Sequence, residues 1–399
     1  MRHENIFPLI EYGDICGFLK SAWENGWLDD YAEDHFLIKA IEGRVTTFVG
    51  NEQMVNNNLN MQGIVLPDGT IDVDTFQNNF CVNLSRRMQF LVEKYGEDNI
   101  KRFTMDQLSA GKENYREDAF FEALSEVSIL FFYAHRASWM EMLYEPPVDR
   151  NTAKNPETKL SGPVYCKMDG IENEYRVSIN IEVKSPEFPH NYHRDAAIAL
   201  PTVLLTTEGR KIVETYCNNH GIIYLPPRVL KLRDFINSAA SKFAVPEKNE
   251  YNLLYINWSY RDFPSNSFLE PWALLTNEVN GILMHPNIAN AIGVHPDALK
   301  KITAIIVYTE SLEGLMFSDF RYVWQRNGVG PRFRMWVLDE ELRHAELEDR
   351  SDVLFKITGM NPDKVCNQRL MATHSPYPSE DEISVLSELL KNIDDNLLT

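Results

Sequence analysis

The segment from residue 176 to residue 184, RVSINIEVK, constrains the fold of this chain more than any other part of the sequence. Polar and apolar residues alternate along it without interruption, and this period of two is typical of a β-strand with one face on a hydrophobic core. Its polar face ends with Glu182 and Lys184, directly before Ser185 and Pro186, where the strand is expected to stop. A carboxylate and an ammonium group side by side at a strand end can bind a divalent cation and act on a polarised water molecule.

The composition is that of a globular protein with more than one domain. The chain has 399 residues, of which 44% are hydrophobic and 11% aromatic, enough for several packed cores. Its five cysteines are widely spaced without a CxxC pair, which argues against a zinc finger and a disulfide framework and favours a reducing compartment. The longest nearly apolar run, residues 127–134, is too short to cross a bilayer, and the N-terminus lacks the apolar segment of a signal peptide. We therefore expect a soluble, cytoplasmic protein with no membrane partner.

The charge balance restricts how the chain can bind nucleic acid. With 39 basic and 58 acidic residues, the formal net charge is -19, and a field of that sign repels phosphate. Binding would require a local basic surface or a basic partner. Two groups of basic residues qualify: Arg228, Lys231, Arg233 and Lys242 on a predicted helix, and Arg321, Arg326, Arg332 and Arg334 among aromatic residues. The second group suits stacking on bases and contact with phosphate, but the simpler and favoured interpretation is a β-hairpin with its aromatic residues in the core and its arginines in solvent.

The order of predicted elements indicates an α/β fold, a mixed β-sheet flanked by helices, with a mostly helical N-terminal region. We divide the chain into a helical region at 1–115, a core at 116–340 with an insertion at 185–227, and an acidic helical region at 341–399. The core is predicted to contain a helix at 118–135, strands at 139–144, 163–167 and 176–184, a helix at 228–243, and strands at 252–258 and 302–308.

This order, together with the residues Asn180-Ile-Glu-Val-Lys-Ser-Pro186, resembles the PD-(D/E)xK nuclease superfamily, the restriction-endonuclease-like fold. The resemblance covers about residues 118–258. It implies a metal-dependent nuclease that uses Mg²⁺, or Mn²⁺, to hydrolyse phosphodiester bonds of DNA in preference to RNA. Restriction or phage defence is one setting that it allows, and a homodimer or a partner subunit is another expectation from the family.

The resemblance also assigns roles to individual residues. Glu182 would be the metal-binding carboxylate, the carbonyl of Val183 a further ligand, and Lys184 the lysine that orients the attacking water. Glu126, on the helix before the sheet, would be the additional acid of the site. The simpler interpretations are a surface ion pair between Glu182 and Lys184, worth less than about 1 kcal/mol, and a solvated acid at Glu126.

Three positions of this sequence could correspond to the aspartate of the family's motif. Asp169 lies in the turn between two predicted strands and would complete the catalytic and metal-binding set, but Asp-Gly is also a common hairpin turn. In another alignment Val164 replaces the aspartate, which would leave a catalytically inactive nuclease-fold subunit for binding or scaffolding. Asp149 is the third candidate. A separate hypothesis is a different metallohydrolase built on His190 and His193.

Overall fold

The structure is a computed structural model, and the elements below are those of the residues that it describes. These are 16–44, 73–136, 143–144, 160–161, 163–167, 174–186, 197–199, 223–225, 229–247, 250–258, 269–276, 281–309, 332–338 and the single positions 211, 215, 216, 218, 219, 354, 357 and 358. Asp149, Asp169, His190 and His193 lie outside the described residues.

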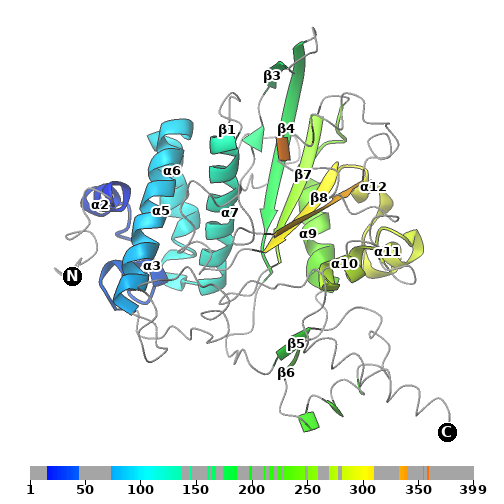
Figure 1. Cartoon of the computed structure of the whole chain (residues 1–399), viewed down its shortest axis with the longest axis horizontal. Coiled ribbons are helices and arrows are strands. Elements are labelled where there is room, and N and C mark those ends of the chain that lie inside the picture. The colour runs from blue at the N-terminus through cyan, green and yellow to red at the C-terminus, as the bar shows by residue number, and fades with distance from the viewer. Residues whose placement is uncertain are drawn as a thin grey trace.

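A five-stranded mixed sheet is the centre of the fold (Figure 1). Its strands, in spatial order, are β3 (Pro163–Lys167), β4 (Glu174–Lys184), β7 (Glu250–Asn257), β8 (Ala304–Thr309) and β9 (Arg332–Val337). The inner strands β4, β7 and β8 run parallel, whereas β3 and β9 pair antiparallel to their neighbours. The predicted α/β class with a mixed sheet is therefore confirmed.

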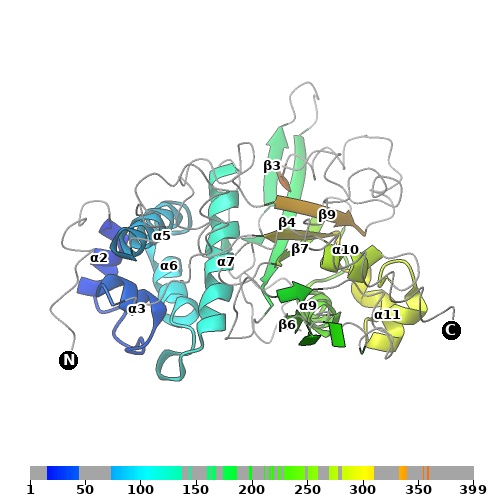
Figure 2. The same cartoon turned by 60° about the horizontal axis from the view of Figure 1, so that its bottom comes forward.

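Four helices precede the helix that covers one face of this sheet. They are α2 (Gly17–Glu24), α3 (Phe36–Ile41), α5 (Val73–Tyr95) and α6 (Glu97–Phe103), followed by a π-helical turn at Thr104–Leu108, a 3₁₀ turn at Lys112–Asn114 and then α7 (Glu117–Arg136). Both views place α7 between the other helices and the sheet (Figures 1 and 2). The mostly helical N-terminal region is confirmed for the described residues.

The hydrophobic core runs without a break from these helices to the sheet. Leu91 of α5, Phe131 of α7 and Ile179 of β4 belong to one buried cluster, which crosses the predicted domain boundary after residue 115. Long apolar side chains on two sides of α7 account for this, because the helix packs against α5 on one side and against the sheet on the other. The free thiols Cys16 and Cys81 are buried in the same cluster.

The opposite face of the sheet packs on a second group of helices. These are α9 (Val229–Lys242), α10 (Leu269–Thr276), α11 (Pro286–Ile292) and α12 (Pro296–Leu299). Leu254 and Ile256 of β7 and Ile305 of β8 form the second core there, against Leu232 and Ile236 of α9. Short strands complete the described elements: β1 (Leu143–Tyr144) with β2 (Leu160–Ser161), and β5 (Ala197–Ala199) with β6 (Ile223–Leu225).

The alternating strand is buried on both faces, not on one as its pattern predicted. Ile179 and Val183 face the α7 side, where they are 3% and 4% exposed. On the other face Asn180 is 1% exposed and Glu182 is fully buried, since α9 lies over it. Parallel strands in the interior of a sheet are normally covered on both faces by helices, and β4 follows this rule despite its polar residues.

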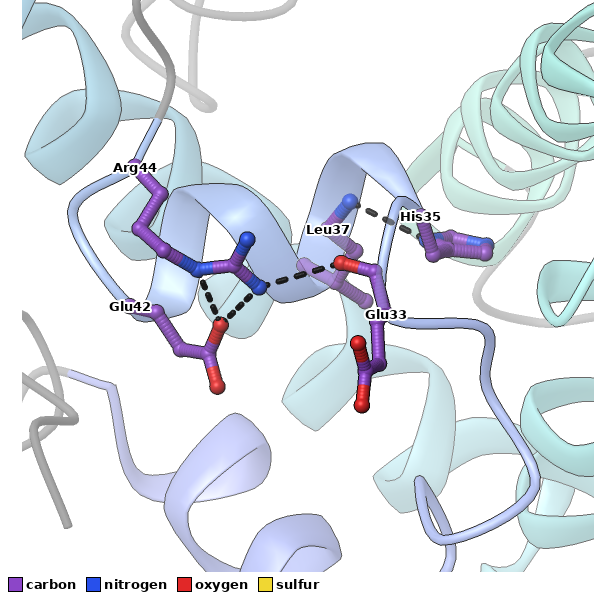
Figure 3. Close-up of polar contacts among 5 residues, drawn as sticks. All are labelled: Glu33, His35, Leu37, Glu42 and Arg44. Atoms are coloured by element: carbon purple, nitrogen blue, oxygen red, sulfur yellow. Dashed lines mark hydrogen bonds and ion pairs between the residues drawn. The ribbon is translucent and has the colours of Figure 1, made fainter. Parts of the chain in front are cut away.

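The N-terminus of α3 shows how the helical region satisfies a buried polar group (Figure 3). Nδ1 of His35 accepts a hydrogen bond from the Leu37 N–H at 3.1 Å, which caps the helix. Because Nδ1 accepts, the proton is on Nε2, which donates to the Leu108 carbonyl at 3.1 Å. His35 is fully buried, and this burial lowers its pKa to about 3.

None of the helices in the described part of the chain combines the length and apolar character that a membrane crossing requires.

Candidate functional site

The candidate site is centred on the carboxylate of Glu182, near the end of β4. Nζ of Lys184, two residues further along the strand, lies 3.1 Å from Oε1 of Glu182. Nζ of Lys242, from α9, contacts the same oxygen. In the register of the sheet Glu182 lies opposite Leu254, close to the edge at which the parallel strands β4, β7 and β8 all end. Binding sites of α/β sheets commonly form at this edge.

The three charged side chains form a buried cluster and not a surface pair. The side chain of Glu182 is fully buried, and the side chains of Lys184 and Lys242 are 18% and 10% exposed. The interpretation as a solvated surface ion pair is therefore wrong. Burying these charges has a desolvation cost, which their mutual attraction offsets only when the geometry is favourable.

One oxygen of the Glu182 carboxylate is left open. Oε2 is buried and accepts no hydrogen bond from any residue that the structure describes. Buried carboxylate oxygens usually have a hydrogen-bond partner, because the desolvation penalty of an oxygen without one is not offset by any interaction. A cation or a strong hydrogen-bond donor at Oε2 would supply the missing interaction.

Lys242 reaches this carboxylate because of its position on α9. Leu232, Ile236 and Ala239 are buried against the sheet at helical spacing, and Lys242 follows Ala239 by three residues on the same side. The sequence placed Lys242 in a basic group that could bind nucleic acid, whereas in the structure the whole residue is only 8% exposed. The available signal was a lysine at the spacing of the helix's apolar face.

A network of amides lies next to the charged cluster. Nδ2 of Asn180 donates to Oδ1 of Asn252 at 2.7 Å and to Oε1 of Glu250 at 2.8 Å. Nδ2 of Asn252 in turn donates to the carbonyls of Ala244 and Lys301, both at 2.8 Å. These bonds join β4 and β7 to the chain that follows α9. The network was not predicted, because its members are distant in sequence and meet only when the parallel strands pair.

Val164 does not lie beside Glu182. It pairs with Val177, five residues before Glu182, and so is about 17 Å away along the strand. The described end of the same hairpin, where Lys167 pairs with Glu174, is further still from Glu182. Asp169 itself lies outside the described residues, in the connection between these two strand ends.

Glu126 lies on the other side of the sheet. The neighbouring Ser125 accepts a hydrogen bond from Nδ2 of Asn257 at 2.9 Å, on the face that α7 covers. Val183 faces the same side and is 4% exposed. Glu126 itself is buried at 8% exposure, so the prediction of a solvated acid is wrong. Within the described ranges, no three His, Cys, Asp or Glu side chains come together as a metal-binding group.

The cluster of arginine and aromatic residues is described only in part. Arg332 and Arg334 lie on β9, at the edge of the sheet. Met335 and Trp336 of the same strand are 0% and 1% exposed, so they are core residues. This agrees with the simpler interpretation for that strand, and the rest of the cluster lies outside the described residues.

The donor atoms at Glu182 match a magnesium site in part. Mg²⁺ prefers oxygen ligands and is often held by one or two carboxylates while it keeps several waters. The open oxygen of Glu182 is one such ligand, and the carbonyl of Val183 is one residue away. A comparison with models of known families, with curated proteins and with solved structures finds no match to this chain.

Proposed function

We propose that the protein is a Mg²⁺-dependent nuclease that hydrolyses phosphodiester bonds of DNA in preference to RNA. The observation that carries the proposal is the buried carboxylate of Glu182, which has one open oxygen and lies 3.1 Å from the Lys184 ammonium group. In this proposal Oε2 of Glu182 and the carbonyl of Val183 hold the ion. Mn²⁺ would replace Mg²⁺, because both prefer oxygen ligands.

The order of elements supports the same proposal. The helix α7 is followed by the antiparallel pair β3 and β4, then by α9 and by β7 parallel to β4. This is the order expected for a restriction-endonuclease-like core, and the motif residues Glu182 and Lys184 lie at the end of β4, the second strand of the sheet. We include in this proposal that the sheet and its helices form a restriction-endonuclease-like core, and that the protein acts in restriction or phage defence.

The residues of the site have distinct tasks in hydrolysis. A bound Mg²⁺ supplies positive charge to the phosphate and lowers the pKa of its bound water. The Glu182 carboxylate binds and orients the ion, and its burial limits access of other water molecules to the site. The Lys184 ammonium group, which is partly exposed, donates hydrogen bonds to the attacking water and stabilises the negative charge that develops on the phosphoryl oxygens.

A cleavage assay tests the proposal. Plasmid DNA, linear DNA and RNA are incubated with the purified protein and Mg²⁺ or Mn²⁺, and wild type is compared with Glu182→Ala and Lys184→Ala. We expect cleavage that falls at least about 10²-fold in each variant. Lys300→Ala is the matched control, because Lys300 is exposed and pairs with Asp297 at 2.9 Å, away from the site. Cleavage that survives both site substitutions rules out this site.

A catalytically inactive nuclease-fold subunit is the second candidate. It is favoured because no group of three or more His, Cys, Asp or Glu side chains that could hold a metal ion occurs in the part of the chain that the structure describes. Such a protein would bind nucleic acid or a partner subunit without cleaving. Retained DNA binding by wild type, without cleavage of any tested substrate, would support it over the nuclease.

A further inference from the structure

Lys242 is the residue of the cluster that the sequence motif does not contain. It comes from α9, 60 positions after Glu182, and contacts the same carboxylate oxygen as Lys184. Oε1 of Glu182 thus accepts a hydrogen bond from Lys242 and forms an ion pair with Lys184, and Oε2 is the oxygen left open. The two oxygens of one carboxylate are therefore in different surroundings, and Lys242 is part of the reason.

The end of α9 is fixed on both sides of Lys242. Two residues before it, the carbonyl of Ala240 accepts from Nζ of Lys301 at 3.2 Å. Two residues after it, the carbonyl of Ala244 accepts from Nδ2 of Asn252 at 2.8 Å. Asn252 is itself held by Asn180 of β4, two positions before Glu182 on the same strand. The backbone that carries Lys242 is thereby tied to the strand that carries Glu182.

We propose that Lys242 is a positioning residue for the metal ligand Glu182. It holds Oε1 and balances the charge of the carboxylate, so that Oε2 is presented to the divalent cation. Because Lys242 serves this purpose, Lys184 can leave the carboxylate and act on the water and the phosphate. The inference rests on the proposed function, and it assigns a third residue to the same site.

Stability alone does not explain a lysine at this position. The rest of the α9 face that packs on the sheet is apolar, with Ile236 and Ala239 at 0% exposure. Apolar side chains in place of both members of a buried ion pair are often neutral or stabilising, so packing alone would be served equally well by apolar residues at positions 182 and 242. Residues that orient a metal ligand from outside the coordination shell, by contrast, affect metal affinity by 10- to 100-fold.

Titration calorimetry with Mn²⁺ tests the inference without measuring catalysis. Wild type is compared with Lys242→Met, which keeps the length but removes the charge, and with Lys242→Arg, which keeps the charge. We expect the Kd for Mn²⁺ to rise at least about 10-fold in Lys242→Met and to stay within about 3-fold of wild type in Lys242→Arg. Lys231→Met, on the same helix but three turns away, is the control and should bind as wild type does.

Thermal unfolding of each variant accompanies the titrations. If Lys242→Met does not fold, Lys242→Gln replaces it, because glutamine is neutral but can still donate to Oε1. Unchanged or tighter Mn²⁺ binding by the folded neutral variant overturns the inference, and tighter binding would mean that Lys242 competes with the ion.

The same titrations separate this inference from the proposed function. Mn²⁺ binding that requires Glu182 but not Lys242 removes the positioning role and leaves the nuclease proposal intact. A wild-type protein that binds no Mn²⁺ removes both.

Discussion

The helical N-terminal region and the interface between β4 and α9 differ in how well the hydrogen-bonding atoms of a buried polar side chain are satisfied. In the first, His35 is fully buried and both its ring nitrogens have backbone partners, at 3.1 Å each. In the second, Glu182 is equally buried, but two cations crowd one of its oxygens and the other accepts no hydrogen bond from the described residues. The first arrangement is complete without a ligand, and the second is not.

This difference helps to tell structural from functional burial. Capping interactions such as that of His35 stabilise a helix end and need no further partner. A buried carboxylate with an open oxygen has a desolvation penalty that a bound ion would offset. Unsatisfied buried groups of this kind are found mainly at functional sites. Four expected effects on stability test this difference between the two regions.

Substitution Glu182→Leu should destabilise the protein by about 4 kcal/mol, because it leaves the buried Lys242 and the partly buried Lys184 beside an apolar group. The double variant Glu182→Leu/Lys242→Met should recover most of this loss, since it replaces the pair by apolar side chains of similar volume. Urea unfolding of wild type, the single variant and the double variant measures both effects. A single variant as stable as wild type would show that the cluster is not buried in solution.

Substitution Asn252→Leu should cost about 3 kcal/mol, since it removes the donor that satisfies the carbonyls of Ala244 and Lys301. Asn237→Ala is the matched control: Asn237 also donates to a carbonyl, that of Gly293 at 2.8 Å, but at an exposed position. The control should lose less than about 1 kcal/mol in the same urea experiment. Equal losses in the two variants would contradict a special role of the amide network.

Acidification should destabilise the helical region through His35. Burial lowers its pKa to about 3, whereas the unfolded chain takes up the proton near pH 6.5, so the contribution is full above pH 6.5 and is lost as the pH falls toward 3. Between pH 7 and pH 5 we expect a loss of about 2 kcal/mol in the free energy of unfolding.

The variant His35→Asn isolates this contribution to the pH dependence. Asparagine can still accept from the Leu37 N–H as a helix cap but does not titrate. Its unfolding free energy should change less between pH 7 and pH 5 than that of wild type. A wild-type slope that the substitution leaves unchanged would exclude His35 as the cause.

Substitution Arg44→Ala should have the smallest effect, less than about 1 kcal/mol. Arg44 pairs with Glu42 and donates to the Glu33 carbonyl at 3.0 Å, but its side chain is 40% exposed (Figure 3). Solvent therefore screens the pair, and added salt should reduce the difference between wild type and variant further. A loss above about 2 kcal/mol in urea unfolding would contradict this expectation and would mean that the pair is as important for stability as a buried one.

The sequence correctly predicted the type and approximate bounds of several helices and strands. The strand predicted at 163–167 matches β3, and the strand predicted at 176–184 is β4 apart from two added residues at its start. Helix 118–135 corresponds to α7 within one residue at each end. These segments have a strong local periodicity, which reflects the side-chain directions of a strand or a helix and does not depend on distant residues.

Tertiary contacts were harder to foresee. The burial of Glu126, which lies on α7, and the covering of the polar face of β4 by α9 depend on packing between elements that are far apart in the chain. Asp169 as a metal ligand, the use of DNA and the setting in defence remain predictions.

The alternating pattern of residues 176–184 was enough to identify the strand that holds Glu182 and Lys184 and to place both on one side of it, because a period of two sets the side-chain directions locally. The burial of this polar side, the contact of Lys242 with the carboxylate and the open oxygen of Glu182 became evident only from the fold. Burial and charge neutralisation depend on what packs against a side chain, and Lys242 of α9 lies 60 positions after Glu182 in the chain.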